Sequence, residues 1–330
     1  MRRILTALWT LVCLAVLVTI TWLPASLGQR IGFAQFIAWP EPTLAVLGAI
    51  GVLLLASALV TRHAVRTTIA MVAVVVLVAL PWGLPRLADP PRAYAADAVP
   101  PADDGALRVL AWNVAGQEES LGDVADVAAT VSPQVIALPE TTLSEAHELA
   151  DDLAARGIRM TALPTSGSDA AWPSSVLVSP SLGGYRVVAD TSQTVRPGIA
   201  ITSRSGGPTI VVAHAQQPGF DAEQASTWRE HLAWLAAWCD RGEAIIVGDF
   251  NGTDGNIGRT LGSCTAPGAD AAGSTTGGTW PSALPAWLSA PIDRVYTSGW
   301  RVSGLWPIDG QRDGASDHRP IVTDLVRAQD

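Results

Sequence analysis

Residues 244–251, AIIVGDFN, decide how the globular part of this 330-residue chain is interpreted. The apolar run Ala244–Val247 predicts a short buried strand, and the polar side chains of Asp249 and Asn251 follow at its end. A lone Asp or Asn after a strand is usually a turn residue. The segment therefore indicates a functional site only if other strands end in the same way.

Polar or ionisable side chains border several other apolar runs of the chain. One such residue follows each of the runs LRVLAW, VIALP and TIVVA, and others stand at the start of two later strands; in chain order they are Asn113, Glu140, His214, Asp293, Asp317 and His318. Turn chemistry does not account for this repetition. Because strand ends are rigid and converge at one edge of a sheet, we expect these side chains to form a single site.

The composition of this set predicts phosphoester hydrolysis with a hard metal ion. Glu140, Asp317 and Asn113 offer oxygen ligands, which suit Mg²⁺ or Mn²⁺. The sequence has no CxxC or HExxH motif that would indicate zinc. His214 and His318 can bind and protonate phosphate oxygens.

The two polar residues of the opening segment complete this chemistry. Asp249 is a candidate base for an attacking water molecule, and Asn251 can donate an amide hydrogen bond beside it. A hydrated cation, a base and cationic donors around one pocket are what in-line attack of water on a phosphoester requires.

Apolar periodicity predicts helices at Leu121–Val131, Ser144–Arg156 and Asp221–Cys239, and a further helix that ends at Cys264. About ten short strands accompany them, which predicts an α/β domain of two packed sheets covered by helices at residues 107–330. The sequence shows no internal repeat. A disulfide between Cys239 and Cys264 is a hypothesis, and two buried thiols are the alternative.

The first 84 residues have a different character. Three apolar runs, Ile4–Leu23, about 44–60 and about 67–84, predict three transmembrane helices. A cleaved signal peptide is the alternative for the first run, but two more runs follow it. Residues 85–106, rich in Pro, Ala and Asp, predict an extended linker to the globular domain.

Charge sets the expected orientation and disfavours one class of partner. Arg2 and Arg3 precede the first run, and Arg62 and Arg66 lie between the second and third, so the positive-inside rule places everything after residue 84 outside the cytoplasmic membrane. The net charge is +4 for residues 1–84, −2 for 85–106 and −11 for 107–330. An acidic domain argues against a nucleic-acid partner, because phosphate binding relies on a basic surface.

The motifs LAWN, LPE, VAHAQQP, GDFN, IDRVY and SDHRPI occur in this order between residues 107 and 326. Together they resemble those of the endonuclease/exonuclease/phosphatase superfamily, which includes DNase I-like nucleases, neutral sphingomyelinases and inositol polyphosphate 5-phosphatases. The resemblance implies a four-layer α/β sandwich of two mainly antiparallel sheets and a Mg²⁺-dependent site. The sequence departs from the family pattern at Pro139, where Gln is common, and at Ala213, where Thr is usual.

The resemblance also implies a role for each residue. Glu140 binds the metal, Asn113 orients its ligands, and Asp317 contributes to it. Asp249 aligns or deprotonates water.

The remaining implied roles concern the phosphate. Asn251 donates to the transition-state oxygens, and His214 and His318 face the scissile phosphate. Asp293 pairs with His318, whereas for His214 no partner is identifiable and Asp169 is only a guess.

The motifs do not name the substrate. Three spans followed by this domain resemble VanJ-type membrane proteins linked to teicoplanin resistance, which implies a lipid-linked phosphate such as undecaprenyl pyrophosphate. The expected partners are the lipid bilayer and a phosphorylated lipid or other phosphoester, with no protein partner implied. The alternatives are a membrane-tethered extracellular nuclease and a catalytically silent binding module. Trp280 and Trp287 precede Asp293 in a Gly/Pro/Ala-rich loop that either packs against the domain or dips toward lipid.

Overall fold

The computed structural model describes residues 91–115, 120–163, 173–189, 198–219, 221–268, 271–272, 277–287, 289–309 and 316–328. The three runs predicted to span a membrane, residues 1–84, lie outside these ranges. Within them, no helix combines the length and the apolar character that are needed to cross a bilayer.

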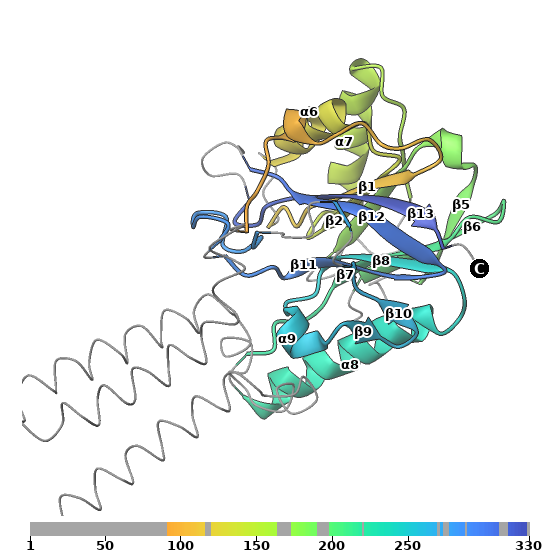
Figure 1. Cartoon of the computed structure of the whole chain (residues 1–330). Helices are drawn as coiled ribbons and strands as arrows, with labels where there is room; N and C mark the ends of the chain where they lie inside the picture. Colours follow the sequence, from red (N-terminus) through yellow and green to blue (C-terminus); the bar gives the residue numbers. More distant parts are fainter. Residues whose placement is uncertain are drawn as a thin grey trace, which may run out of the picture.

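Two mixed β-sheets pack face to face, and helices cover their outer faces (Figure 1). The first sheet contains β1 (Leu107–Ala111), β2 (Val135–Pro139), β3 (Thr161–Ala162), β4 (Ser174–Val178), β12 (Trp300–Pro307) and β13 (Ile321–Arg327). Its strand order is β12–β13–β1–β2–β4–β3. Helices α6 (Ser120–Val131) and α7 (Leu143–Ala155) lie on its outer face (Figure 1).

The second sheet lies beneath the first in Figure 1. It contains β5 (Tyr185–Ala189), β6 (Gly198–Ser203), β7 (Thr209–His214), β8 (Ala244–Asp249), β9 (Thr260–Leu261), β10 (Cys264–Thr265) and β11 (Asp293–Ser298). Its order is β5–β6–β7–β8–β11–β10–β9, and α8 (Ala222–Cys239) and α9 (Asp254–Ile257) cover it. Two short 3₁₀ turns, Ala96–Ala98 and Pro180–Leu182, complete the described elements. The predicted two-sheet domain flanked by helices is confirmed.

Both faces of each sheet are buried, which explains why the strands read as continuous apolar runs. In β1, Val109 and Ala111 belong to the core between the sheets, whereas Leu110 belongs to the core beneath α6 and α7. One parallel pair lies inside each otherwise antiparallel sheet, β1 with β2 and β7 with β8. The carboxyl ends of each pair therefore lie at one edge of its sheet.

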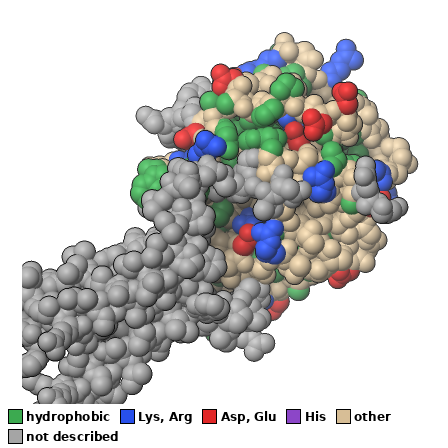
Figure 2. Space-filling model, viewed as in Figure 1, with side chains coloured by type: hydrophobic (Ala, Val, Ile, Leu, Met, Phe, Trp, Pro, Cys, Tyr) green, Lys and Arg blue, Asp and Glu red, His purple; other side chains and the backbone are tan. Residues whose placement is uncertain are grey.

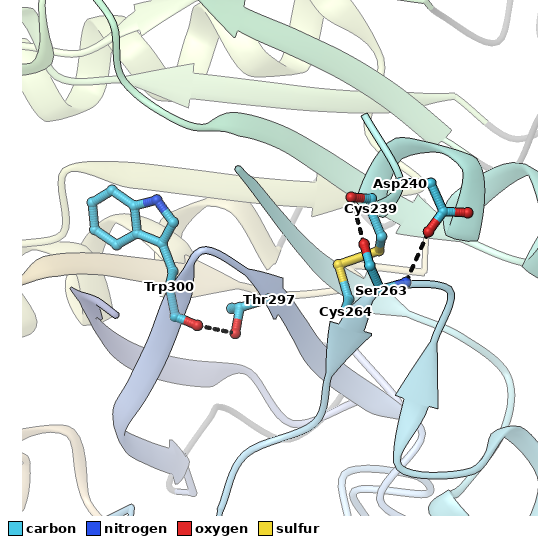
Figure 3. The surroundings of a disulfide bond; sticks show 6 residues. All are labelled: Cys239, Asp240, Ser263, Cys264, Thr297 and Trp300. Atoms are coloured by element: carbon cyan, nitrogen blue, oxygen red, sulfur yellow. Dashed lines mark hydrogen bonds between the residues drawn. A yellow bond between two sulfur atoms is a disulfide. The ribbon is translucent and has the colours of Figure 1, made fainter. Parts of the chain in front are cut away.

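A disulfide joins Cys239, at the end of α8, to Cys264 in β10 (Figure 3). Ser263 adjoins it and donates hydrogen bonds from its hydroxyl to the Cys239 carbonyl and from its backbone N–H to Asp240. The disulfide hypothesis is confirmed over the alternative of two buried thiols, but the predicted helix that ends at Cys264 is wrong. Only the single turn α9 forms there, because glycines at 258 and 262 adopt φ values of +93° and +59°, which end the turn and close the β9–β10 hairpin.

The described part of the predicted linker, residues 91–106, packs against the domain instead of standing away from it. Tyr94 bridges to Ile308, and its N–H donates to the Pro307 carbonyl at 2.8 Å. Val99 is buried in the core beneath α6. Residues 91–106 therefore pack as part of the domain, whereas residues 85–90 of the predicted linker lie outside the described residues.

Candidate active site

Asn113 joins the two sheets at the edge where β1, β2, β7 and β8 end. Its Nδ2 donates to Glu140 Oε1 at 3.0 Å, within the first sheet, and to Asp249 Oδ2 at 3.1 Å, in the second. Its Oδ1 accepts from the N–H of Ala115. These contacts bring together two carboxylates whose strands are far apart in the chain, as the sequence predicts.

Glu140 stands directly after β2 with a left-handed backbone, φ +56°. This conformation is uncommon for Glu and is typical of residues held at functional sites. Its Oε1 lies 3.3 Å from His214 Nε2. Burial raises the pKa of the Glu140 carboxyl, but hydrogen bonds from His214 and Asn113 outweigh burial, and the pKa lies below its ordinary value. Glu140 is therefore an anion at neutral pH.

Asp249 is the last residue of β8 and is 1% exposed. Its Oδ1 accepts from the Asn251 N–H at 2.7 Å, and its Oδ2 lies 3.2 Å from Asn251 Nδ2. The Asn251 Nδ2 also donates to the Ala215 carbonyl. In this arrangement Asn251 holds the base through its N–H and its amide nitrogen. Its implied role as a donor to the transition-state oxygens stays a prediction.

A glycine in β8 allows β7 and β8 to lie close together at this edge. Gly248 has φ +134°, and a Cβ there would lie 2.3 Å from the Ala213 carbonyl oxygen. The parallel register sets His214 opposite Asp249 one residue later. The Gly of GDFN is thus a requirement of the backbone that carries the site.

His318 pairs with Asp293, as predicted. Its Nδ1 lies 2.8 Å from Asp293 Oδ2, and both side chains are buried. His318 Nε2 faces the other carboxylates, 3.9 Å from Asp249 Oδ2 and 4.0 Å from Asp317 Oδ1. The imidazole is thus held by one acid while its second nitrogen points into the site.

The surroundings of His318 and Asp249 shift their pKa values in the direction that catalysis needs. Burial lowers the pKa of His318, but the charges of Asp293, Asp249 and Asp317 and the hydrogen bond to Asp293 raise it to about 10. Burial also raises the pKa of Asp249 to about 6, against the opposing charge of His318. At neutral pH the site therefore contains an imidazolium beside a carboxylate that can take up a proton close to neutrality.

Asp317 lies at the rim, with a side chain that is 57% exposed. Its Oδ2 accepts a 2.8 Å hydrogen bond from the indole of Trp280. Asp317 adjoins the site through its Oδ1, which lies 4.0 Å from His318 Nε2 at the edge of the buried cluster.

The donor set fits a hard cation. The pKa of Glu140 is lowered, so that its carboxylate is anionic, and Asp317 Oδ1 lies 4.0 Å from His318 Nε2 at the rim of the site. With the side-chain carbonyl of Asn113, the carboxylates of Glu140 and Asp317 offer an all-oxygen set of ligands. Asp249, Asp293 and His318 also place one potential ligand atom each within 4.8 Å of one another. In that cluster His318 Nδ1 and Asp293 Oδ2 already engage each other at 2.8 Å.

Several residues that hold the site are not among those predicted. Trp112 donates from its indole to the His318 carbonyl at 2.9 Å, and the Ser316 hydroxyl donates to the Asn113 carbonyl and accepts from the His318 N–H. Thr279 Oγ1 accepts from the Asp293 N–H. Each joins segments distant in sequence, so only the placement of Trp112 and Ser316 inside the motifs signals them. Asp169, the guessed partner of His214, lies outside the described residues.

Solved structures share the fold at low sequence identity. An endonuclease/exonuclease/phosphatase from Bacteroides vulgatus is 13% identical, with a TM-score of 0.50 over 68% of this chain and 99% of the other. D. rerio TDP2 complexed with a single-strand DNA product is 15% identical, with a TM-score of 0.50 over 68% and 100% of the two chains. TDP2 from Caenorhabditis elegans is 17% identical, with a TM-score of 0.51 over 68% and 75%. At these identities the likeness establishes the fold alone.

No curated protein matches the sequence. The model of the endonuclease/exonuclease/phosphatase family matches residues 110–318, from the strand that precedes Asn113 through His318. This match spans all of the residues that the structure gathers at the sheet edges, and it covers more than half of the chain. The chain therefore belongs to the endonuclease/exonuclease/phosphatase family of metal-dependent phosphoester hydrolases.

Proposed function

We propose that the chain is a Mg²⁺-dependent phosphohydrolase that acts outside the cytoplasmic membrane on a membrane-associated phosphoester or pyrophosphate, with undecaprenyl pyrophosphate as a candidate. The chemical part of this proposal is supported by the position of the His318 imidazolium, whose Nε2 lies 3.9 Å from Oδ2 of the Asp249 carboxylate. It provides a cationic donor and a base beside the same carboxylate-rich pocket.

In this proposal each of these residues has a separate role in the reaction. Asp249 accepts a proton from water as the water oxygen bonds to phosphorus. The bond from phosphorus to the leaving oxygen breaks on the opposite side, and that oxygen departs with the electron pair. His318 donates a hydrogen bond to a phosphoryl oxygen, His214 donates to Glu140, and Asn251 keeps Asp249 in place.

Glu140, Asp317 and Asn113 are the residues that would hold Mg²⁺. When bound, the ion would neutralise phosphate charge and lower the pKa of a coordinated water. Asn113 also connects this ligand set to the base, because its amide nitrogen contacts both Glu140 and Asp249.

Three observations support a membrane-associated substrate. Three apolar runs precede the domain, and three such spans followed by this domain resemble VanJ-type membrane proteins linked to teicoplanin resistance. The Cys239–Cys264 disulfide is the kind of bond that persists in oxidising compartments. The net charge of −11 over residues 107–330 disfavours binding to nucleic acid.

The test is phosphate release by the full chain in detergent or nanodiscs, with lipid pyrophosphate, lipid monophosphate, nucleotides and DNA as substrates. We expect Mg²⁺-dependent release from the lipids, abolished by EDTA and by His318→Ala. The matched control is His147→Ala, on an exposed position of α7, which should retain full activity. Rapid DNA degradation without release from lipids would favour the tethered nuclease, and phosphate binding without turnover of any substrate would favour a binding module.

A further inference from the structure

We infer that the loop before β11 forms a membrane-facing tip that rests in the interface of the bilayer and turns the active site toward lipid phosphates. The tip loop comprises residues 277–287. It carries Trp287, 52% exposed, and Leu284, 41% exposed. Among the described residues, the one other large hydrophobic side chain with such exposure is Val188 in β5.

A buried arginine makes the tip loop a built structure. Arg319 is 2% exposed, and its guanidinium donates to the carbonyls of Ser282 at 2.7 Å and Leu284 at 2.5 Å. The same group donates to Ser289 Oγ at 3.1 Å. The exposed apolar side chains are therefore presented by a supported backbone, which is how rigid recognition elements are held.

The tip loop is also joined directly to the active site. Trp280 donates to the Asp317 carboxylate, and the Ser282 N–H donates to the Asp317 carbonyl at 2.7 Å. Arg319 follows His318 in the chain. A surface that takes up the tip would therefore lie next to the rim of the phosphate site.

The chain that leads back to the predicted anchor leaves the domain at this loop. The Gly277 N–H donates to the Arg92 carbonyl at 3.0 Å. The third apolar run ends at about residue 84, and the eight residues 85–92 span at most roughly 28 Å when fully extended. The attachment point thus keeps the tip loop close to the surface of the bilayer. Figure 2 shows hydrophobic side chains gathered at the left edge of the domain, over the loop that precedes β11 in Figure 1.

The chemistry of the tip favours lipid over a protein partner. A Trp and a Leu together expose far less than the roughly 800 Å² per partner that a stable protein interface buries. Trp side chains prefer the headgroup region of a bilayer, where the ring is partly apolar and the N–H meets polar groups. The occupant we assign to the tip is therefore the interfacial layer of the membrane.

This inference rests on the proposed membrane attachment but not on the identity of the substrate, so its test separates the two. In the full chain with Cys13→Ser, Leu284→Cys or Trp287→Cys is labelled with an environment-sensitive fluorophore, and Val188→Cys is the matched control. Each protein is reconstituted into phospholipid vesicles, and quenching by spin-labelled lipid is compared with quenching by aqueous iodide. We expect lipid to quench the labels at 284 and 287, and iodide to quench the label at 188.

A second measurement reports on function. Leu284→Ser with Trp287→Ser should lower turnover of a vesicle-embedded lipid pyrophosphate roughly tenfold, because two apolar contacts with lipid are lost. Hydrolysis of a soluble phosphodiester should stay unchanged. Labels at 284 and 287 that iodide quenches as strongly as the label at 188 would overturn the inference, even if lipid is hydrolysed. Lipid-quenched labels without lipid hydrolysis would retain the tip and refute the proposed function.

Discussion

The two sheets of this protein carry the same supersecondary unit with different chemistry at its end. In the first sheet, β1 and β2 are parallel and α6 connects them; in the second, β7 and β8 are parallel and α8 connects them. An antiparallel strand flanks each unit, β13 beside β1 and β11 beside β8, and both begin at the site. The backbone plan is repeated, although the sequence shows no repeat.

The two units contribute unlike side chains. The first ends in Asn113 and Glu140, which offer oxygen ligands, and the second ends in His214 and Asp249, which offer a donor and a base. Asn113 bridges them through one amide nitrogen. The comparison teaches that neither unit is an active site alone and that the interface between the sheets creates it.

The largest expected effect comes from removing one carboxylate of each unit. We expect Asp249→Asn and Glu140→Gln each to lower kcat/KM by at least roughly 10³-fold, because the base is lost in one and a metal ligand in the other. Only Glu140→Gln should regain part of its activity at high Mg²⁺. Glu148→Gln, on the exposed face of α7, is the control. Equal responses of both variants to Mg²⁺ titration would contradict the division of labour between the units.

The second prediction concerns the flanking strands and pH. Asp293→Asn should lower kcat roughly 10²–10³-fold, since the imidazole loses the group that orients it and keeps it protonated. In the wild type, the pKa of His318 is raised to about 10 from an ordinary value near 6.5. The contribution of protonated His318 to the free energy of unfolding is therefore complete below about pH 6.5 and is lost as the pH rises toward 10.

Thermal unfolding and NMR titration check this sign. From pH 6.5 to 10 the midpoint temperature of unfolding should fall more steeply for the wild type than for Asp293→Asn. In the NMR titration, the His318 resonance of the variant should titrate at a lower pH than that of the wild type. Asp249, with a pKa of about 6, titrates below this window and does not mask it. Asp151→Asn, on an exposed position of α7, should follow the wild type. Parallel slopes in all three proteins would show that His318 is neutral.

The third prediction contrasts how the units are fastened. The first contains a buried ion pair, in which Arg108 Nε lies 2.7 Å from Asp324 Oδ1 and joins β1 to β13. The second contains the Cys239–Cys264 disulfide, which ties α8 to β10. Cys239→Ala with Cys264→Ala should lower the free energy of unfolding by about 3 kcal/mol. Activity at 25 °C should change little, because the bond lies away from the site residues.

Hydrogen exchange with and without reductant locates the effect. Reductant should accelerate exchange in β8–β11 of the wild type and leave β1 and β13 unchanged. The double variant, which has no disulfide to reduce, should not respond at all. Faster exchange throughout the domain would mean that the two units unfold as one and that the disulfide does not act locally.

Short-range patterns in the sequence were enough to predict most of the site and the layers of the fold. Apolar runs that end in Asn113, Glu140, His214 or Asp249 identify the strands, because burial on both faces makes these runs continuous. The helix predicted after β8 is wrong, since glycines at 258 and 262 favour a hairpin there. The sequence does not predict the hydrogen bonds of Trp112 and Trp280 to the site, because they depend on packing between distant segments, which no local pattern encodes.

The smallest expected effect tests how the rim connects to the first unit. Trp280→Phe removes the indole N–H that holds Asp317 Oδ2, while it preserves the aromatic ring. Because a hydrogen bond to a metal ligand fixes its orientation, the Mg²⁺ concentration for half-maximal activity should rise roughly tenfold. The kcat at saturating Mg²⁺ should stay within roughly threefold of the wild type. Trp300→Phe is the matched control, since its indole bonds to Glu243 at 3.0 Å on an exposed surface away from the site. A fall in kcat with an unchanged Mg²⁺ requirement would instead place Asp317 with the phosphate-binding His318, and the metal would then depend on Glu140 and Asn113 of the first unit.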